Sequence, residues 1–186
     1  MKKIKLALLV AGSLVAGAST SAFAAEGQGT VTFNGELINE TCKIAGDKDQ
    51  TVPLPKVSVK TLAAAGDEGG YKPFKIEVDC SGAEASGLDG KTVAIHFEPI
   101  PKTTAWDSAT GNLKNNDATG AKNVQVKIYS TDGGQQVHAK IGDTGKGVKI
   151  EGTKKMTFNY VGGYYATAAT TAGLVNATVM YTLVYQ

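Results

Sequence analysis

The sequence predicts an all-β domain, a β-sandwich of immunoglobulin-like type. Three observations lead to this prediction: stretches of alternating apolar and polar residues recur along the chain, clusters of Gly, Asp and Asn separate them, and helical periodicity is scarce. Because alternation with a period of two places every second side chain on one face of a strand, about seven such strands can enclose a shared core between two sheets.

Each alternating stretch predicts one strand. The stretch after the first cysteine contains Pro53 and Pro55, which makes it an edge or interrupted strand because proline cannot donate a ladder hydrogen bond. Residues 59–66, VKTLAAAG, predict instead a helical turn that ends at Gly66. The predicted strands are residues 30–37, 51–59, 71–80, 92–98, 123–129, 155–161 and 175–185.

The first 24 residues have the pattern of a secretory signal peptide. Three lysines precede an apolar run from Leu6 to about Gly17, and small residues follow, so cleavage is expected after Ala24. The alternative is a membrane anchor, but the run is shorter than the roughly 20 residues of a spanning helix, and serine and threonine interrupt it. The sequence therefore predicts an exported protein.

Loss of this leader changes the charge of the chain. It removes three of the 19 basic residues and none of the 17 acidic ones, so the formal charge falls from +2 to −1. A charge this close to zero argues against a nucleic-acid or anionic-membrane partner.

Cys42 and Cys80 are the two cysteines. In an exported protein they are expected to form one disulfide, which joins the start of the strand near residue 51 to the end of the strand at 71–80. The alternatives fit less well, because two cysteines without a nearby histidine cannot fill a zinc site, and their spacing is not that of a CxxC redox centre.

Candidates for catalytic or ligand-binding chemistry are few. His96 and His138 lie on separate segments and are expected on sheet surfaces, and no cluster of metal-ligating residues accompanies them. Residues 142–147, GDTGKG, depart from the phosphate-loop pattern and predict a hairpin turn. Trp106 is expected to pack in a loop, and a ligand-stacking role beside Asp107 is the alternative. We therefore expect no enzyme activity, no metal and no cofactor.

The two ends of the exported chain carry apolar strands. At the carboxyl end, one face holds alternate residues from Ala177 to Tyr185, and no charge or proline blocks the strand edge. At the amino end, residues 30–37 have one apolar face, and they form either the first strand of an ordinary closed sandwich or a strand free to pair elsewhere. The apolar face at the amino end is Gly29, Val31, Phe33, Gly35 and Leu37.

These features together resemble the major structural subunits of type 1-like fimbriae assembled by the chaperone–usher route. The resemblance spans the exported chain in order. It is carried by GTVTFNG at 29–35, Asn39, Cys42, DQTVPLPKV at 49–57, Cys80, the final stretch YYATAATTAGLVNATVMYTLVYQ at 164–186 and the penultimate Tyr185.

The resemblance implies an incomplete immunoglobulin-like sandwich of six core strands that lacks its final strand. It divides the chain into a signal peptide (1–24), an amino-terminal donor-strand extension (25–38) and a pilin domain (39–186). It implies that the donor residues Gly29, Val31, Phe33, Gly35 and Leu37 enter a groove on the next subunit. The implied acceptor residues are Val179, Tyr181, Leu183, Tyr185 and Gln186.

The resemblance also implies partners and location. The subunit is expected to polymerise with copies of itself into a fimbria on the cell surface that supports adhesion, after export through the periplasm. A periplasmic chaperone, an outer-membrane usher and tip or adaptor subunits are the other expected partners. The alternatives are a minor or adhesive pilus subunit, and a self-complete secreted sandwich that binds carbohydrate or a receptor.

Overall fold

The structure, a computed structural model, describes residues 29–39, 41–100, 105–151 and 154–186. The predicted signal peptide lies outside the described residues. The chain divides between Leu37 and Ile38 into two compact units. In the first unit, residues 29–37 belong to no helix or strand, so the strand predicted at 30–37 has no ladder there. The side chains of Val31, Phe33 and Leu37 are 77%, 91% and 102% exposed, respectively.

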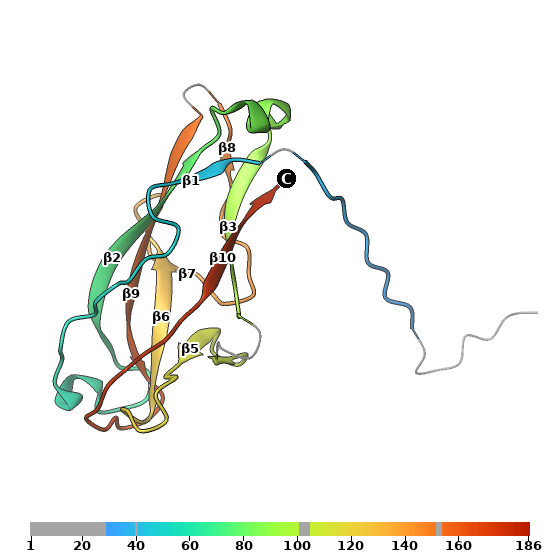
Figure 1. The fold of residues 1–186 in the computed structure, drawn as a ribbon. Coiled ribbons are helices and arrows are strands. Elements are labelled where there is room, and N and C mark those ends of the chain that lie inside the picture. Colours follow the sequence, from blue (N-terminus) through green and yellow to red (C-terminus); the bar gives the residue numbers. More distant parts are fainter. Residues whose placement is uncertain (1–28, 40, 101–104, 152–153) are drawn as a thin grey trace, which may run out of the picture. The chain divides into compact units, whose positions relative to one another are not determined.

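The second unit is a sandwich of two antiparallel sheets (Figure 1). The smaller sheet has the order β10 (Met180–Tyr185), β3 (Thr92–Glu98) and β8 (Val148–Lys149). The larger sheet has the order β1 (Lys43–Ala45), β2 (Glu68–Asp79), β9 (Lys155–Ala166), β6 (Val124–Ser130), β5 (Asn112–Lys114) and β4 (Trp106–Asp107), and β7 (Val137–His138) also pairs with β6.

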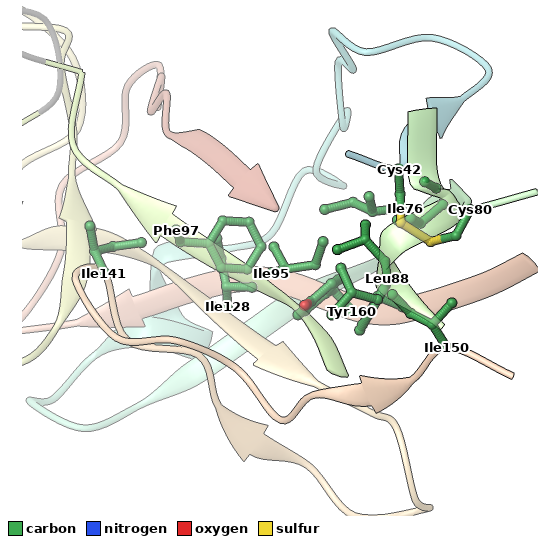
Figure 2. Close-up of a cluster of buried hydrophobic side chains, with 14 of the residues drawn as sticks. Cys42, Ile76, Cys80, Leu88, Ile95, Phe97, Ile128, Ile141, Ile150 and Tyr160 are labelled. Atoms are coloured by element: carbon green, nitrogen blue, oxygen red, sulfur yellow. A yellow bond between two sulfur atoms is a disulfide. The ribbon is translucent and has the colours of Figure 1, made fainter. Parts of the chain in front are cut away.

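The core lies between the two sheets. Figure 2 shows buried side chains of both sheets in contact, with Ile76 and Tyr160 from the larger sheet and Ile95 and Phe97 from β3. Phe97 packs edge-on against the ring of Tyr160, with ring centroids 5.1 Å apart. The core therefore uses the apolar faces that alternation predicted for β2, β3 and β9.

The long pair of β2 and β9 forms the middle of the larger sheet. It pairs from Asp79 opposite Lys155 to Glu68 opposite Tyr165, with a register shift between Gly69 and Lys72. At that shift Gly70 has a φ of +66°, and a Cβ there would lie 2.6 Å from the ring of Tyr164. A larger residue at position 70 would therefore strain the backbone and clash with that ring.

Three predictions about elements are corrected by the structure. No ladder includes residues 51–58, because Pro53 and Pro55 remove two ladder donors. Val52, Leu54 and Val57 of this segment are nevertheless half-buried. The strand predicted at 175–185 begins at Met180. The disulfide joins the residue before β1 to the residue after β2, so it lies ahead of the segment near residue 51.

Other local predictions hold. The helical turn predicted at 59–66 is a 3₁₀ helix, η1 (Val59–Leu62), and Gly66 follows it with a φ of +89°. Ser58 caps this helix by accepting a hydrogen bond from the amide of Lys60. A second 3₁₀ helix, η2 (Ala83–Leu88), lies within a stretch that the sequence predicted only as turns.

Candidate functional site

The candidate site is the free edge of β10. One edge of β10 pairs with β3 over its whole length, from Met180 opposite Glu98 to Tyr185 opposite Val93. The ladder continues to Gln186, which exchanges two backbone hydrogen bonds with Thr92. Among the described residues no strand pairs with the other edge of β10, the strand that carries the C-terminus in Figure 1. Such an edge presents unpaired backbone groups to another chain.

One face of β10 and of the segment before it packs on the core without being fully buried. The residues on this face alternate with exposed ones, such as Thr178 and Thr182. An apolar face that is only half-buried retains surface that a further element can cover. The half-buried residues are Ala177, Val179, Tyr181, Leu183 and Tyr185.

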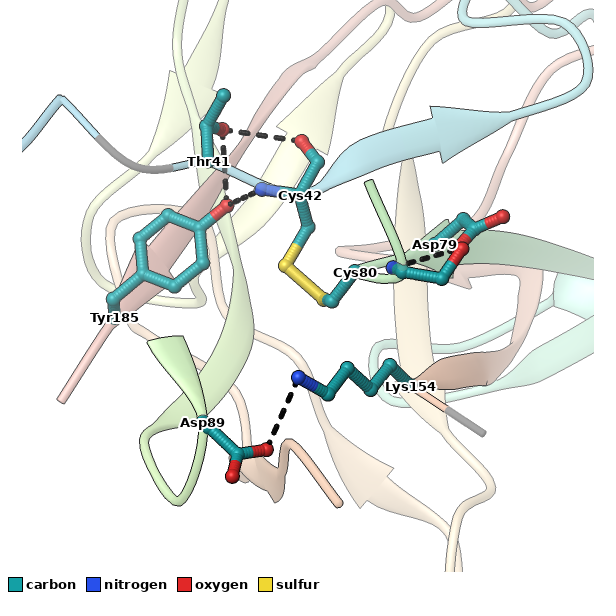
Figure 3. Close-up of a disulfide and its surroundings, with 8 residues drawn as sticks. Thr41, Cys42, Asp79, Cys80, Asp89, Lys154 and Tyr185 are labelled. Atoms are coloured by element: carbon teal, nitrogen blue, oxygen red, sulfur yellow. Dashed lines mark hydrogen bonds and ion pairs between the residues drawn. A yellow bond between two sulfur atoms is a disulfide. The ribbon is translucent and has the colours of Figure 1, made fainter. Parts of the chain in front are cut away.

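Tyr185 reaches from β10 to the start of the domain (Figure 3). Its hydroxyl accepts a hydrogen bond from the backbone amide of Cys42 at 2.8 Å and lies 3.1 Å from the hydroxyl of Thr41. The hydroxyl of Thr41 donates to the carbonyl of Cys42, so the hydroxyl proton of Tyr185 is the one shared with Thr41.

Tyr181 makes a second contact of the same kind. Its hydroxyl donates a hydrogen bond of 2.8 Å to the backbone carbonyl of Lys48. Burial raises the pKa of Tyr181, and the nearby charge of Asp49 acts in the same direction, so the phenol stays protonated and remains a donor at neutral pH. We call β10 and the facing segment 41–48 the acceptor edge.

The disulfide fixes one side of the acceptor edge. Cys42 and Cys80 are bonded, and both are buried. The short β1 follows directly and pairs with the end of β2, from Lys43 opposite Asp79 to Ala45 opposite Glu77. The segment that Tyr185 contacts is therefore held to the larger sheet by a covalent bond and a ladder.

No catalytic or metal-binding constellation is found among the described residues. No group of three or more His, Cys, Asp or Glu side chains could hold a metal ion there. His96 is half-buried on β3, with its Nδ1 3.1 Å from the hydroxyl of Thr144. His138 was expected on a sheet surface, but its Nε2 is buried and has no hydrogen-bond partner.

Trp106 has a packing role. It lies in β4 and packs, half-buried, against the core cluster, whereas the sequence placed it in a loop. Its ring is therefore used inside the subunit, which disfavours a role as a platform for stacking a ligand.

Comparisons with known proteins decide the family. The family profile described as fimbrial protein matches residues 31–186. The chain belongs to this fimbrial protein family. It is 35% identical to the F17 fimbrial protein of Escherichia coli over the full length of both chains. It is 37% identical to the major fimbrial subunit SMF-1 of Stenotrophomonas maltophilia, over 92% of this chain and 99% of that protein.

Solved structures confirm the fold of this fimbrial protein. The P pilus rod subunit PapA superposes with a TM-score of 0.58 at 20% identity, covering 78% of this chain and 99% of that chain. The immunoglobulin-like pilin fold predicted from the sequence is therefore confirmed. The fimbrial protein is a structural subunit of a fimbria on the cell surface. No helix among its described residues is long and apolar enough to cross a membrane.

The structure brings some of the predicted site residues together. Val179, Tyr181, Leu183 and Tyr185 share the core-facing side of one chain segment, and Gln186 extends the ladder on β3. The predicted donor residues lie in the other unit of the fimbrial protein.

Sequence reasoning missed the facing side of the acceptor edge, at Thr41 and Lys48. The available signal was the presence of two tyrosines on a core-facing strand, since a buried phenol needs a hydrogen-bond partner. The hydrogen-bond partners of these tyrosines could not be deduced, because each bond joins residues that are far apart in the sequence of the domain.

Proposed function

We propose that the subunit polymerises by donor-strand exchange, in which residues 29–37 of one copy pair with the acceptor edge of the next. The observation that carries this proposal is the free edge of β10 with its half-buried apolar face. An extended segment can add to such an edge through backbone hydrogen bonds, while its alternate side chains enter pockets.

The amino-terminal segment supplies complementary chemistry. When this segment pairs as a strand, the period of two places Val31, Phe33 and Leu37 on one face, and all three are largely exposed in the subunit. Burying three such side chains and forming a run of backbone hydrogen bonds stabilises the pair by about 10 kcal/mol before ordering costs. That free energy is comparable to the whole stability of a domain, so the junction between subunits should be very persistent.

A subunit whose acceptor edge is unfilled should be prone to aggregation at high concentration, because apolar surface and a free strand edge are both exposed. This supports the proposal that a periplasmic chaperone holds the edge first. At an outer-membrane usher, the donor segment of the next subunit then replaces the chaperone. Tip or adaptor subunits are proposed partners by the same strand addition. We assign the subunit no catalytic activity, in keeping with relatives that are structural fimbrial subunits.

The test uses the exported chain with Phe33→Asp, which places a charge on the donor face. We expect this variant to fold but to form no polymer, because a carboxylate is costly to bury in an apolar pocket. A synthetic peptide of residues 25–41 should then raise its melting temperature in a saturable way.

A peptide that itself carries Asp at position 33 is the matched control and should have little effect. Normal polymer from the variant chain contradicts the proposal. So does a well-folded variant that ignores the wild-type peptide.

A further inference from the structure

Two tyrosine hydroxyls bridge the acceptor edge, with which no strand among the described residues pairs. We propose that Tyr181 and Tyr185 form a latch, which holds this edge closed and must release before a donor strand can pair. The two hydroxyls thereby set the rate of donor uptake. This inference rests on the proposed function and adds to it the residues that control the exchange step.

The end of the latch at Tyr185 is a closed ring of three hydrogen bonds. The amide of Cys42 donates to the tyrosine hydroxyl, that hydroxyl donates to Thr41, and the hydroxyl of Thr41 donates back to the carbonyl of Cys42. Since the disulfide and β1 fix Cys42 in place, the ring ties the end of β10 to a rigid position of the larger sheet (Figure 3).

The end at Tyr181 has a single bond to a different group. Its hydroxyl donates to the carbonyl of Lys48, in the stretch that follows β1. The side chain of Gln50 donates to the carbonyl of Lys75 on β2, which ties this stretch to the larger sheet as well. Both ends of the latch thus join β10 to main-chain groups that are themselves held to the opposite sheet.

The two tyrosine hydroxyls bind backbone groups that a donor strand would otherwise use. A strand that pairs with a sheet edge uses the backbone amides and carbonyls that face it. The amide of Cys42 and the carbonyl of Lys48 are such groups, and side-chain hydroxyls satisfy them here. A strand inserted between β10 and this segment competes for the same groups, so the latch and the donor exclude one another.

The distance between the two tyrosines is shorter than the donor segment, so a donor strand has to displace both hydroxyls. Tyr181 and Tyr185 are four residues apart on one strand, which is roughly 13 Å along its axis. A donor that seats both Val31 and Leu37 spans roughly 20 Å, so a donor aligned with β10 passes both tyrosines. Release of both hydroxyls is therefore a step in every insertion of that length.

The experiment measures the rate of peptide uptake by the full chain. The common background carries Phe33→Asp, so the chain's own donor face is impaired, and a fluorescent peptide of residues 25–41 is added in a stopped-flow instrument. Tyr181→Phe and Tyr185→Phe keep each ring but remove its hydroxyl. We expect Tyr181→Phe to accelerate uptake about fivefold, the effect of one lost net hydrogen bond. Tyr185→Phe removes two hydrogen bonds and should accelerate uptake more, and the double variant by about the product of the two single effects, because distant sites act additively.

Tyr164→Phe is the matched control, because that ring packs over Gly70 on the opposite sheet, and its uptake rate should equal that of the background. Peptide affinity should rise by the same factors as the rates, since only the unoccupied state loses bonds. Cooperative melting of each variant verifies that it is folded.

The outcomes separate the two proposals. If the background chain never takes up the peptide, donor-strand exchange fails, and the latch fails with it. If the background takes up the peptide but the tyrosine variants do so at an equal or lower rate, exchange stands and the latch is wrong. Weaker binding by the variants also overturns the latch, because it means that the hydroxyls keep their partners beneath a bound donor.

Discussion

Cys42 and Cys80 face each other one position beyond the last pair of the β1–β2 ladder, Lys43 and Asp79, with their Cα atoms 4.3 Å apart. The disulfide thus closes the end of that ladder. It also holds the amide that donates to Tyr185, so one covalent bond supports both the core and the acceptor edge.

Replacing both cysteines with serine should lower the free energy of unfolding by about 4 kcal/mol, the loop-closure entropy of a bridge that spans 38 positions. The midpoint of guanidinium unfolding measures this loss. Reductant should shift the wild-type midpoint toward that of the variant and leave the variant unchanged. Equal midpoints for the oxidised wild type and the variant would show that the bridge does not contribute to stability.

The long strands could be predicted from the sequence because their periodicity is local. β3 coincides with its predicted range of 92–98, and β2, β6 and β9 contain most of theirs. The strands of two or three residues between 106 and 149 were missed, since so few residues cannot show a period. Their existence depends on pairing partners distant in sequence.

The candidate site could be predicted in part for the same reason. Alternation placed Val179, Leu183 and the two tyrosines on one face, and the structure has them there. The contacts across the acceptor edge depend on how the start of the domain folds against its end, which no local pattern encodes. The same holds for His138, whose burial follows from the elements packed around β7.

A second prediction concerns Glu68 and Lys127, which pair on β2 and β6. Their side chains are 21% and 16% exposed, and the ammonium lies 2.7 Å from the carboxylate. Burial alone would raise the pKa of Glu68, but hydrogen bonds from Lys127, Tyr71 and Tyr129 outweigh it and lower that pKa. We expect Lys127→Met to cost about 2 kcal/mol of stability, because it leaves a largely buried carboxylate without its cation.

Chemical denaturation measures this cost, and the exposed pair of Lys75 and Glu77 supplies the control. Their side chains are 59% and 44% exposed, so Lys75→Met should cost less than about 1 kcal/mol. Equal losses for the two lysine variants would contradict the importance assigned to the largely buried pair.

A third prediction is a loss of stability in mild acid through His138. Burial lowers the pKa of His138, and the charges of Lys127 and Lys140 lower it further, while Glu68 and Asp143 oppose them. Because the folded-state pKa lies below the unfolded value of about 6.5, the unfolded chain binds the proton first. The stability that neutral His138 contributes is fully present above the unfolded-state pKa and is lost as the pH falls through the folded-state pKa.

Melting temperatures measured from about pH 8 to about pH 5 test this prediction. The difference between wild type and His138→Gln should shrink as the pH falls. A difference between wild type and His138→Gln that does not change with pH would mean that protonation of His138 is not linked to folding.

The last prediction concerns Gly35, which is placed on the donor face by the proposed exchange. A Cβ at this position meets no atom within 4 Å, so Gly35→Val should leave the subunit's own melting temperature unchanged. In the junction between subunits, however, we expect the groove to approach the backbone of Gly35 closely, so that the added methyl groups overpack it at a cost of about 1–3 kcal/mol. We therefore expect slower assembly and fibres that dissociate at lower denaturant concentrations, measured by electron microscopy and gel filtration.

Asn34→Val adds similar bulk to the opposite face and should assemble normally. If Gly35→Val assembles as fast as Asn34→Val into fibres of equal resistance, position 35 does not face a confined pocket, and the register of the donor along β10 must be assigned differently.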